Sequence, residues 1–167
     1  MLAAMSQEHT FACKLVWTGA ERGPLTDYAT YSREYVVEME GKPPMRGSAA
    51  PTYRGDASLH NPEDWLVAAL SGCHCLSYLA HCARAGIVVV AYEDAAFGRL
   101  ALRDGKMRFI EVTLAPKVTI QVREVGQAGS DEAKAHALHE KAHADCFIAN
   151  SVNFPVKNDP TILVQAQ

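Results

Sequence analysis

The segment NPEDWLVAALSGCHCLSYLAHCARAG, residues 61–86, constrains the fold more than any other part of the chain. It has the pattern of one helix that is apolar on almost every side, yet it carries three cysteines and two histidines. Asn61 can cap the start, Pro62 suits the first helical position, and Gly86 fits the left-handed residue that ends a helix. About 24 helical residues span about 36 Å, close to the diameter of a small domain.

A helix that is apolar all round must be surrounded by protein. In a chain of 167 residues that is otherwise mostly strand, little material is left to surround it, so a partner subunit is expected to complete the cover. A membrane span is the alternative. We expect none, because the uninterrupted apolar stretch is short and three polar residues fall in its second half: His74, His81 and Arg84.

Length and charge narrow the class of protein. The chain fits one domain over residues 1–167, and its net charge of −3 with scattered Lys and Arg predicts no nucleic acid or anionic membrane as partner. The first ten residues lack the features of a secretory signal. We therefore expect a cytoplasmic protein with reduced thiols, since an odd set of five cysteines is a poor disulfide framework: Cys13, Cys73, Cys75, Cys82 and Cys146.

The segments on either side of this helix favour strands. Residues 9–18 and 29–40 alternate and are rich in β-formers, which predicts an N-terminal antiparallel pair. Residues 41–60 hold three prolines and three glycines without periodicity, and we expect a long ordered loop there. Residues 87–122 are strand-rich, and Asp104-Gly105 within them predicts a two-residue hairpin turn.

The remainder predicts a second helix over residues 130–145, capped by Ser130, and a final strand over residues 161–167. Residues 146–153 are expected to begin a short helix, with Cys146 at its start. Strands and helices do not alternate regularly along the chain. The order of elements therefore predicts an α+β fold rather than a doubly wound sheet.

The thiols of the long helix cannot bridge each other. Cys73 and Cys75 are about 200° apart around the helix, and Cys75 and Cys82 are about 10 Å apart along its axis, beyond the reach of a disulfide. Any dithiol chemistry must therefore recruit Cys146 or Cys13. Cys75 and Cys82 are expected to be small buried hydrophobes.

Histidines on the second predicted helix raise the possibility of a metal site. His136, His139, His143 and Cys146 have suitable spacing, and His139 and His143 could chelate zinc. We favour a solvated helix face and no metal, because such spacing is common on alanine- and lysine-rich helices and no acidic general base lies between the two histidines. Packing is also the expected role of a second stripe: Cys73, Ser77 and His81.

Two motifs together carry a family resemblance: NPEDWLVAALSGC, running into a helical cysteine, and KAHADCFIANSV about seventy residues later. In this order and spacing the chain resembles the OsmC/Ohr family of osmotically inducible and organic-hydroperoxide-reducing proteins. The resemblance implies antiparallel sheets packed on a long central helix in an intertwined homodimer. It also implies a thiol peroxidase that needs an organic hydroperoxide, a thiol reductant and no cofactor.

The same resemblance assigns roles to residues. Cys73 matches the peroxidatic cysteine, Cys146 the resolving cysteine and Glu63 the carboxylate, and Arg33 matches the arginine of an early strand. A guanidinium beside the attacking sulfur would stabilise a thiolate, and a carboxylate would hold that guanidinium in place. Three other arginines are alternatives to Arg33: Arg22, Arg46 and Arg54.

One geometric condition accompanies these roles. On a straight helix Glu63 and Cys73 lie about 15 Å apart along the axis, so the helix bends or begins late, or the site takes residues from two chains. His74 stands where the family commonly has an apolar or aromatic residue, which leaves the substrate open. The alternative hypothesis is a non-enzymatic dimer of the same fold that binds an apolar ligand or a metal, with Cys73 and Cys146 as packing residues.

Overall fold

The computed structural model describes residues 8–122 and 125–166. The chain divides into two compact units, Met1–Asp64 (unit 1) and Trp65–Gln167 (unit 2), and the boundary falls in the first turn of the long helix. The two units are described separately. A single domain over residues 1–167 stays a prediction.

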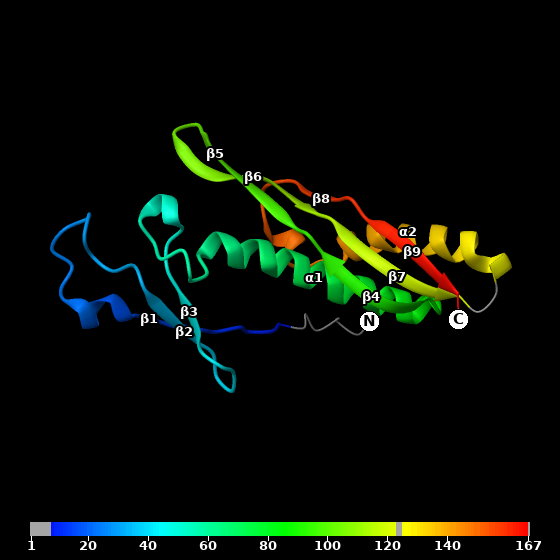
Figure 1. The fold of residues 1–167 in the computed structure, drawn as a ribbon, viewed down its shortest axis with the longest axis horizontal. Coiled ribbons are helices and arrows are strands. Elements are labelled where there is room, and N and C mark those ends of the chain that lie inside the picture. Colours follow the sequence, from blue (N-terminus) through cyan, green and yellow to red (C-terminus); the bar gives the residue numbers. More distant parts are fainter. Residues whose placement is uncertain (1–7, 123–124, 167) are drawn as a thin grey trace, which may run out of the picture. The chain divides into compact units, whose positions relative to one another are not determined.

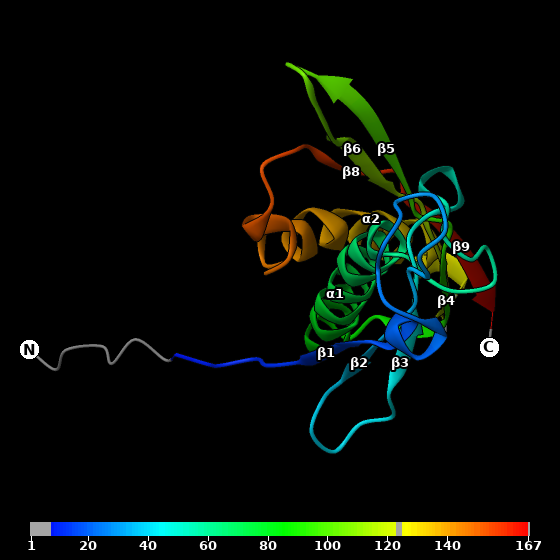
Figure 2. The ribbon, with the colours of Figure 1, turned by 90° about the vertical axis from the view of Figure 1, so that its left-hand side faces the viewer.

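Unit 1 is built on a three-stranded antiparallel sheet (Figure 2). Strands β1 (Lys14–Trp17) and β2 (Tyr35–Glu38) form the predicted pair. The expectation of a plain loop over residues 41–60 is wrong, because β3 (Met45–Gly47) lies in it and pairs with β2. The turn at Gly41 folds this segment back along β2, and the β3 backbone forms hydrogen bonds with β2. The local sequence of residues 41–60 has no strand pattern that would predict this pairing. Two short 3-10 turns complete the unit: η1 (Thr18–Arg22) and η2 (Pro51–Tyr53).

Helix α1 (Pro62–Ala85) has the predicted ends. The Asn61 side chain accepts a hydrogen bond from the Asp64 N–H at 2.9 Å, and the Asp64 carboxylate accepts one from the Asn61 N–H at 3.2 Å. Gly86 ends the helix with a φ of 74°. The helix therefore does not begin late.

Within a single chain, full burial along α1 is confined to one stripe of every fourth residue: Leu70, His74, Tyr78 and Cys82. On another side Ala69 and Gly72 are exposed, and Leu76 exposes 72% of its surface. The chain alone thus does not surround its apolar helix. By length and composition α1 could also cross a membrane, but this is weak evidence, since the core helices of soluble proteins have the same properties.

Unit 2 packs two three-stranded sheets with α1 and the second long helix, α2 (Ala128–Ala144) (Figure 1). One sheet has the order β4-β7-β9 and the other β5-β6-β8. In each sheet one pairing is antiparallel and the other, β7 with β9 or β6 with β8, is parallel. Parallel neighbours need a crossover, and α2, between β7 and β8, supplies it. The strands are β4 (Val88–Asp94), β5 (Phe97–Arg103), β6 (Lys106–Leu114), β7 (Pro116–Val122), β8 (Val156–Asn158) and β9 (Thr161–Ala166).

The core of unit 2 follows from the alternation along β7. Val118, Ile120 and Val122 point to one face and are buried, while the residues between them are more exposed. This face packs against Tyr78 of α1 and Leu138 of α2. A second cluster forms where Leu70 of α1 meets the buried valine and leucine at the end of β6: Val112 and Leu114. The two clusters hold α1 against both sheets.

The start of α2 differs from the prediction. The helix begins at Ala128, after a short 3-10 turn, η3 (Val125–Gln127), so Ser130 lies inside its first turn and is not the cap. A 3-10 turn can lead directly into an α-helix and satisfy the first backbone groups, which removes the need for a serine cap.

The predicted hairpin turn at Asp104-Gly105 connects β5 and β6, with φ of 50° and 74° at the two residues. Replacing Gly105 with alanine is expected to lower the free energy of unfolding by about 1 kcal/mol, because a Cβ disfavours the left-handed backbone. The matched control is Gly129→Ala, in the first turn of α2, where an added Cβ would meet open space, and this change should be neutral or slightly stabilising. Urea unfolding followed by tryptophan fluorescence measures both. Equal effects at the two sites would contradict the argument.

Candidate functional site

Two thiols of unit 2 meet. Cys73 lies in the fourth turn of α1 and is partly exposed, and Cys146 follows the end of α2 and is buried. The two side chains lie within hydrogen-bonding range, and both thiols are free in this structure. Residues 73 positions apart in sequence thus form a dithiol, because α1 and α2 pack side by side.

The surroundings of Cys146 keep it a thiol. Burial raises its pKa, and the neighbouring Cys73 thiol raises the pKa further. The Ala149 N–H points at the Cys146 sulfur at 3.5 Å and opposes the shift. This N–H begins a single 3-10 turn, η4 (Ala149–Ser151), which is shorter than the helix predicted there.

The other cysteines stay outside this pair. Cys82 is buried in the core beside Tyr78, and burial raises its pKa, as expected for a packing residue. Cys75 is partly exposed, and its pKa is raised by burial and by the charge of Asp94. Cys13 is exposed in unit 1.

A buried histidine pair joins the same two helices. His74 of α1 and His139 of α2 are both at most 1% exposed, and their rings meet through Nε2 of His74 and Nδ1 of His139 at 3.0 Å. Tyr78 stacks on the His139 ring at a centroid distance of 3.8 Å. The Tyr78 hydroxyl donates to the Ala135 carbonyl, which holds the stack in place.

Burial lowers the pKa of both imidazoles, to about 4 for His74 and about 3 for His139. For His139, the nearby His74 would add repulsion on protonation. The two outward nitrogens, Nδ1 of His74 and Nε2 of His139, are buried without a hydrogen-bond partner in the described structure. The pair is therefore neutral at physiological pH.

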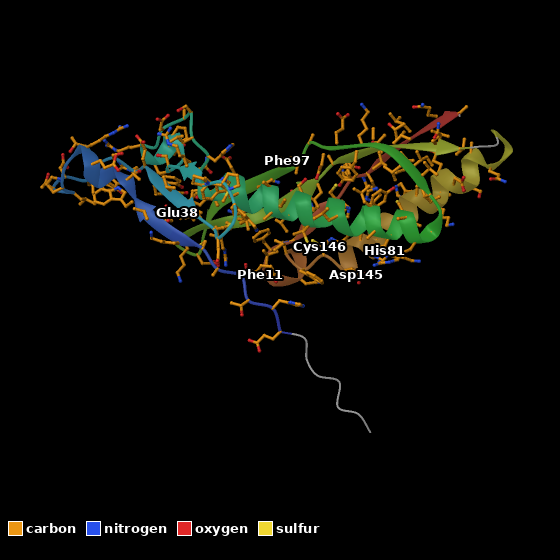
Figure 3. The ribbon with its side chains drawn as sticks, turned by 90° about the horizontal axis from the view of Figure 1, so that it is seen from below. Phe11, Glu38, His81, Phe97, Asp145 and Cys146 are labelled. Carbon is orange, nitrogen blue, oxygen red and sulfur yellow. The ribbon has the colours of Figure 1, made fainter. Side chains whose placement is uncertain are left out.

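The predicted histidine face of α2 is not a solvated surface throughout, since His139 points into the core. In the part of the chain that the structure describes, no group of three or more His, Cys, Asp or Glu side chains has an arrangement that would hold a metal ion. His81, which was expected to pack, instead contacts the Asp145 carboxylate through Nε2 at 2.8 Å (Figure 3).

Arg33 and Glu63, the other two predicted site residues, line one cavity of about 400 Å³ in unit 1. The guanidinium of Arg33 lies over the Tyr31 ring, 4.1 Å from its centroid. Its terminal nitrogens donate to the carbonyls of Tyr31 at 3.0 Å and Tyr28 at 2.8 Å. The ion pairs found among the described residues do not include one between Arg33 and Glu63. Arg33 thus organises the loop that precedes β2.

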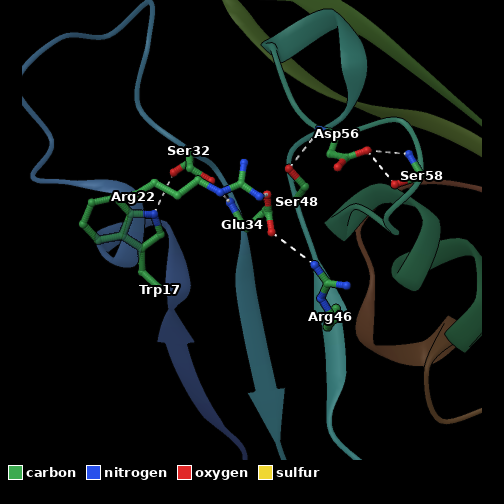
Figure 4. Close-up of polar contacts among 8 residues, drawn as sticks. All are labelled: Trp17, Arg22, Ser32, Glu34, Arg46, Ser48, Asp56 and Ser58. Atoms are coloured by element: carbon green, nitrogen blue, oxygen red, sulfur yellow. Dashed lines mark hydrogen bonds and ion pairs between the residues drawn. The ribbon is translucent and has the colours of Figure 1, made fainter.

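Two of the alternative arginines are also engaged. Arg22 and Arg46 both contact the Glu34 carboxylate, at 2.6 and 3.2 Å (Figure 4). Arg54 has a different environment. Its guanidinium lies 5.8 Å from the Tyr28 ring centroid, and within the described part of unit 1 it takes part in no ion pair or side-chain hydrogen bond.

The structure thus brings the predicted site residues together in two pairs, Cys73 with Cys146 in unit 2 and Arg33 with Glu63 in unit 1. Sequence reasoning missed the contact between His74 and His139. The available signal was that both histidines fall on the apolar stripes of their helices, at the spacing of buried neighbours.

Comparisons with known proteins agree with this architecture. The sequence model described as OsmC-like protein matches residues 55–160. Among solved structures, an OsmC-like protein of unknown function from Vibrio cholerae is similar, with a TM-score of 0.80 and 29% identity over 92% of this chain and 100% of that one. No curated protein matches the chain.

More distant structures share the fold alone. An organic hydroperoxide resistance protein from Elizabethkingia anophelis, with thiocyanate bound, has a TM-score of 0.65 and 17% identity over 96% of this chain and 100% of that one. An organic hydroperoxide resistance protein from Legionella pneumophila has a TM-score of 0.63 and 17% identity over 93% of this chain and 97% of that one.

Proposed function

This chain belongs to the OsmC-like protein family, and we propose that it is a cysteine-based thiol peroxidase. In this proposal the protein reduces organic hydroperoxides to alcohols. The single observation that carries it is the contact between a partly exposed thiol, Cys73, and a buried one, Cys146. Two structural relatives described as organic hydroperoxide resistance proteins support the substrate class.

The chemistry uses the two sulfurs in turn. The Cys73 thiolate attacks the terminal oxygen of the hydroperoxide, the O–O bond breaks, and the alkoxide takes up a proton and leaves as alcohol. Cys73 is now a sulfenic acid. The Cys146 sulfur attacks the Cys73 sulfur, the hydroxyl group leaves as water, and a disulfide forms. Two equivalents of an external thiol then restore both thiols by exchange.

The environment of Cys146 suits the second step. Because burial raises its pKa, Cys146 stays protonated and does not compete for the peroxide. Its contact with Cys73 means that the sulfenic acid forms beside a thiol, and the Ala149 N–H at the Cys146 sulfur favours the thiolate as the proton leaves. The step therefore needs no large rearrangement.

Arg33 and Glu63 complete the proposed site by the family resemblance, Arg33 as the cation near the attacking sulfur and Glu63 as the carboxylate that positions it. We further propose a homodimer as the working form. Its support is the apolar side of α1 that the single chain leaves uncovered, with Leu76 at its centre. The cytoplasm, where thiol reductants are abundant, is the proposed location.

The test is mass spectrometry after one equivalent of cumene hydroperoxide is added to the reduced protein. We expect the mass to fall by two hydrogen atoms and peptide mapping to identify a bond between Cys73 and Cys146. The control is the Cys13→Ser, Cys75→Ser double variant, which should give the same result. An unmodified chain, or a bond that uses a different cysteine, would overturn the proposal.

A further inference from the structure

Unit 1 contains two adjoining cavities that share three lining residues: Tyr31, Arg33 and Ser48. One has a volume of about 400 Å³ and an aromatic lining, and the other has a volume of about 220 Å³ and a lining of charged and polar groups. Together they form a cleft with an aromatic end and a cationic end. The size falls in the range of sites for small organic molecules.

The aromatic end is held in shape by its own contacts. The Trp17 indole N–H donates to the Ser32 carbonyl at 2.7 Å, and Arg33 lies over the Tyr31 ring. Tyr35 and Tyr53 line the same cavity. Several ring faces and edges around one space favour a flat aromatic guest, because offset and edge-to-face ring contacts are stronger than contacts with an alkyl chain of equal area.

At the cationic end, two of the three arginines have partners and the third has no anionic partner among the described residues. Arg22 is compensated by Glu34, and the terminal nitrogens of Arg33 donate to backbone carbonyls. The Asp56 carboxylate, also in the lining, accepts hydrogen bonds from the N–H and hydroxyl of Ser58, at 2.8 and 2.7 Å (Figure 4). Arg54 remains as a charge with no anionic partner in the described residues.

The backbone presents Arg54 in an unusual conformation. Its φ of 65° is left-handed, a backbone conformation that residues with a Cβ rarely adopt. The residues before and after Arg54 fix this turn. The Arg54 N–H donates to the Pro51 carbonyl, and Gly55 packs so closely that an added Cβ would lie 1.6 Å from the Ala49 carbonyl oxygen. Beside it, the buried Ser48 hydroxyl oxygen accepts from the Asp56 N–H, which leaves the hydroxyl hydrogen available to donate.

We propose that this cleft binds an aryl carboxylate, with the ring between the aromatic side chains and the carboxylate on the Arg54 guanidinium and the Ser48 hydroxyl. A carboxylate matches the fork of a guanidinium, and Arg54 lacks such a partner. In one respect the inference rests on the proposed function: if the protein is a peroxidase, its substrates include hydroperoxides that carry an aromatic ring and a carboxylate. Binding itself needs neither cysteine.

The experiment measures the dissociation constants of three probes by calorimetry with the full-length Cys73→Ser variant. The probes are 4-phenylbutyrate, its neutral amide 4-phenylbutyramide, and octanoate. We expect 4-phenylbutyrate to bind at least about tenfold more tightly than the amide, as a charge-assisted hydrogen bond predicts. Octanoate should bind more weakly than 4-phenylbutyrate. Equal affinity of the acid and the amide, or no binding of either, would overturn the carboxylate site, and octanoate binding as tightly as the aryl acid would overturn the aromatic assignment.

Three substitutions locate the effect. In Arg54→Asn the acid should lose its advantage over the amide, because asparagine keeps the left-handed turn but carries no charge. Arg54→Lys should keep part of the advantage, and Arg103→Asn, the same charge change at the exposed end of β5, should keep all of it. An advantage that persists in Arg54→Asn would reject Arg54 as the anchor.

The outcomes also separate this inference from the proposed function. If 4-phenylbutyrate binds but cumene hydroperoxide does not link Cys73 to Cys146, the cleft stands and the peroxidase fails. If the disulfide forms but the probes do not bind, the peroxidase stands and the cleft assignment fails.

Discussion

Hydroperoxide turnover falls by about a thousandfold or more when Cys73 is replaced with serine, if Cys73 is the nucleophile. A serine hydroxyl is not ionised near neutral pH and has no sulfur that could form a sulfenic acid or a disulfide with Cys146, so both steps of the cycle are lost. The measurement is steady-state consumption of cumene hydroperoxide with a dithiol as reductant. Activity within tenfold of the unmodified protein would assign the nucleophile elsewhere.

Two matched variants accompany this one. Cys75→Ser makes the same chemical change two residues away on the same helix, at a side chain that is also partly exposed, and should retain turnover. With no reductant present, Cys146→Ser should consume about one equivalent of hydroperoxide and keep a sulfenic acid on Cys73, because no resolving thiol condenses with it. A dimedone adduct on Cys73 in that variant would identify the trapped intermediate. Full turnover by Cys146→Ser would contradict the resolving role.

The second large effect is a loss of stability in acid. The pKa of His74 and His139 is lowered on folding, so the unfolded chain, with histidine pKa values near 6.5, binds more protons than the folded one as the pH falls. The stability that depends on their neutral forms is present above about pH 6.5 and declines as the pH falls toward 4. With two histidines contributing, the free energy of unfolding changes with pH by up to about 2.7 kcal/mol per pH unit.

Urea unfolding at pH 8 to pH 4.5, followed by tryptophan fluorescence, tests this. The His74→Leu, His139→Leu double variant should lose most of the histidine-dependent slope, while above pH 7 its stability should run parallel to that of the unmodified protein. Carboxylates titrate in both proteins, so the difference between the two curves isolates the pair. Identical curves below pH 6.5 would mean that the two imidazoles do not charge on unfolding.

The sequence predicts the local features of the fold well, because each depends on a few neighbouring residues. Asn61 and Asp64 cap α1, Gly86 ends it in the left-handed region, and Asp104-Gly105 forms the hairpin turn. The prediction fails where pairing is nonlocal. Strand β3 has no recognisable pattern within residues 41–60. It forms because its backbone pairs with the edge of β2.

The candidate site divides in the same way. The family motifs point to Cys73 and Cys146, and the structure places their thiols in contact. The sequence does not show what the Arg33 side chain contacts. In the structure its guanidinium donates hydrogen bonds to the carbonyls of Tyr28 and Tyr31. The sequence does not predict that Arg54 lacks an anionic partner. This depends on the tertiary structure, in which Arg22 and Arg46 both pair with the Glu34 carboxylate.

For this protein, the amino-acid sequence is sufficient for the ends of α1, the hairpin turn and the α+β class, since caps, turns and the order of elements are encoded within short stretches. The packing of α1 against α2 is not encoded in this way. It brings Cys73 to Cys146 and buries His74 against His139, because burial and hydrogen bonding between distant residues depend on how whole faces of the two helices meet.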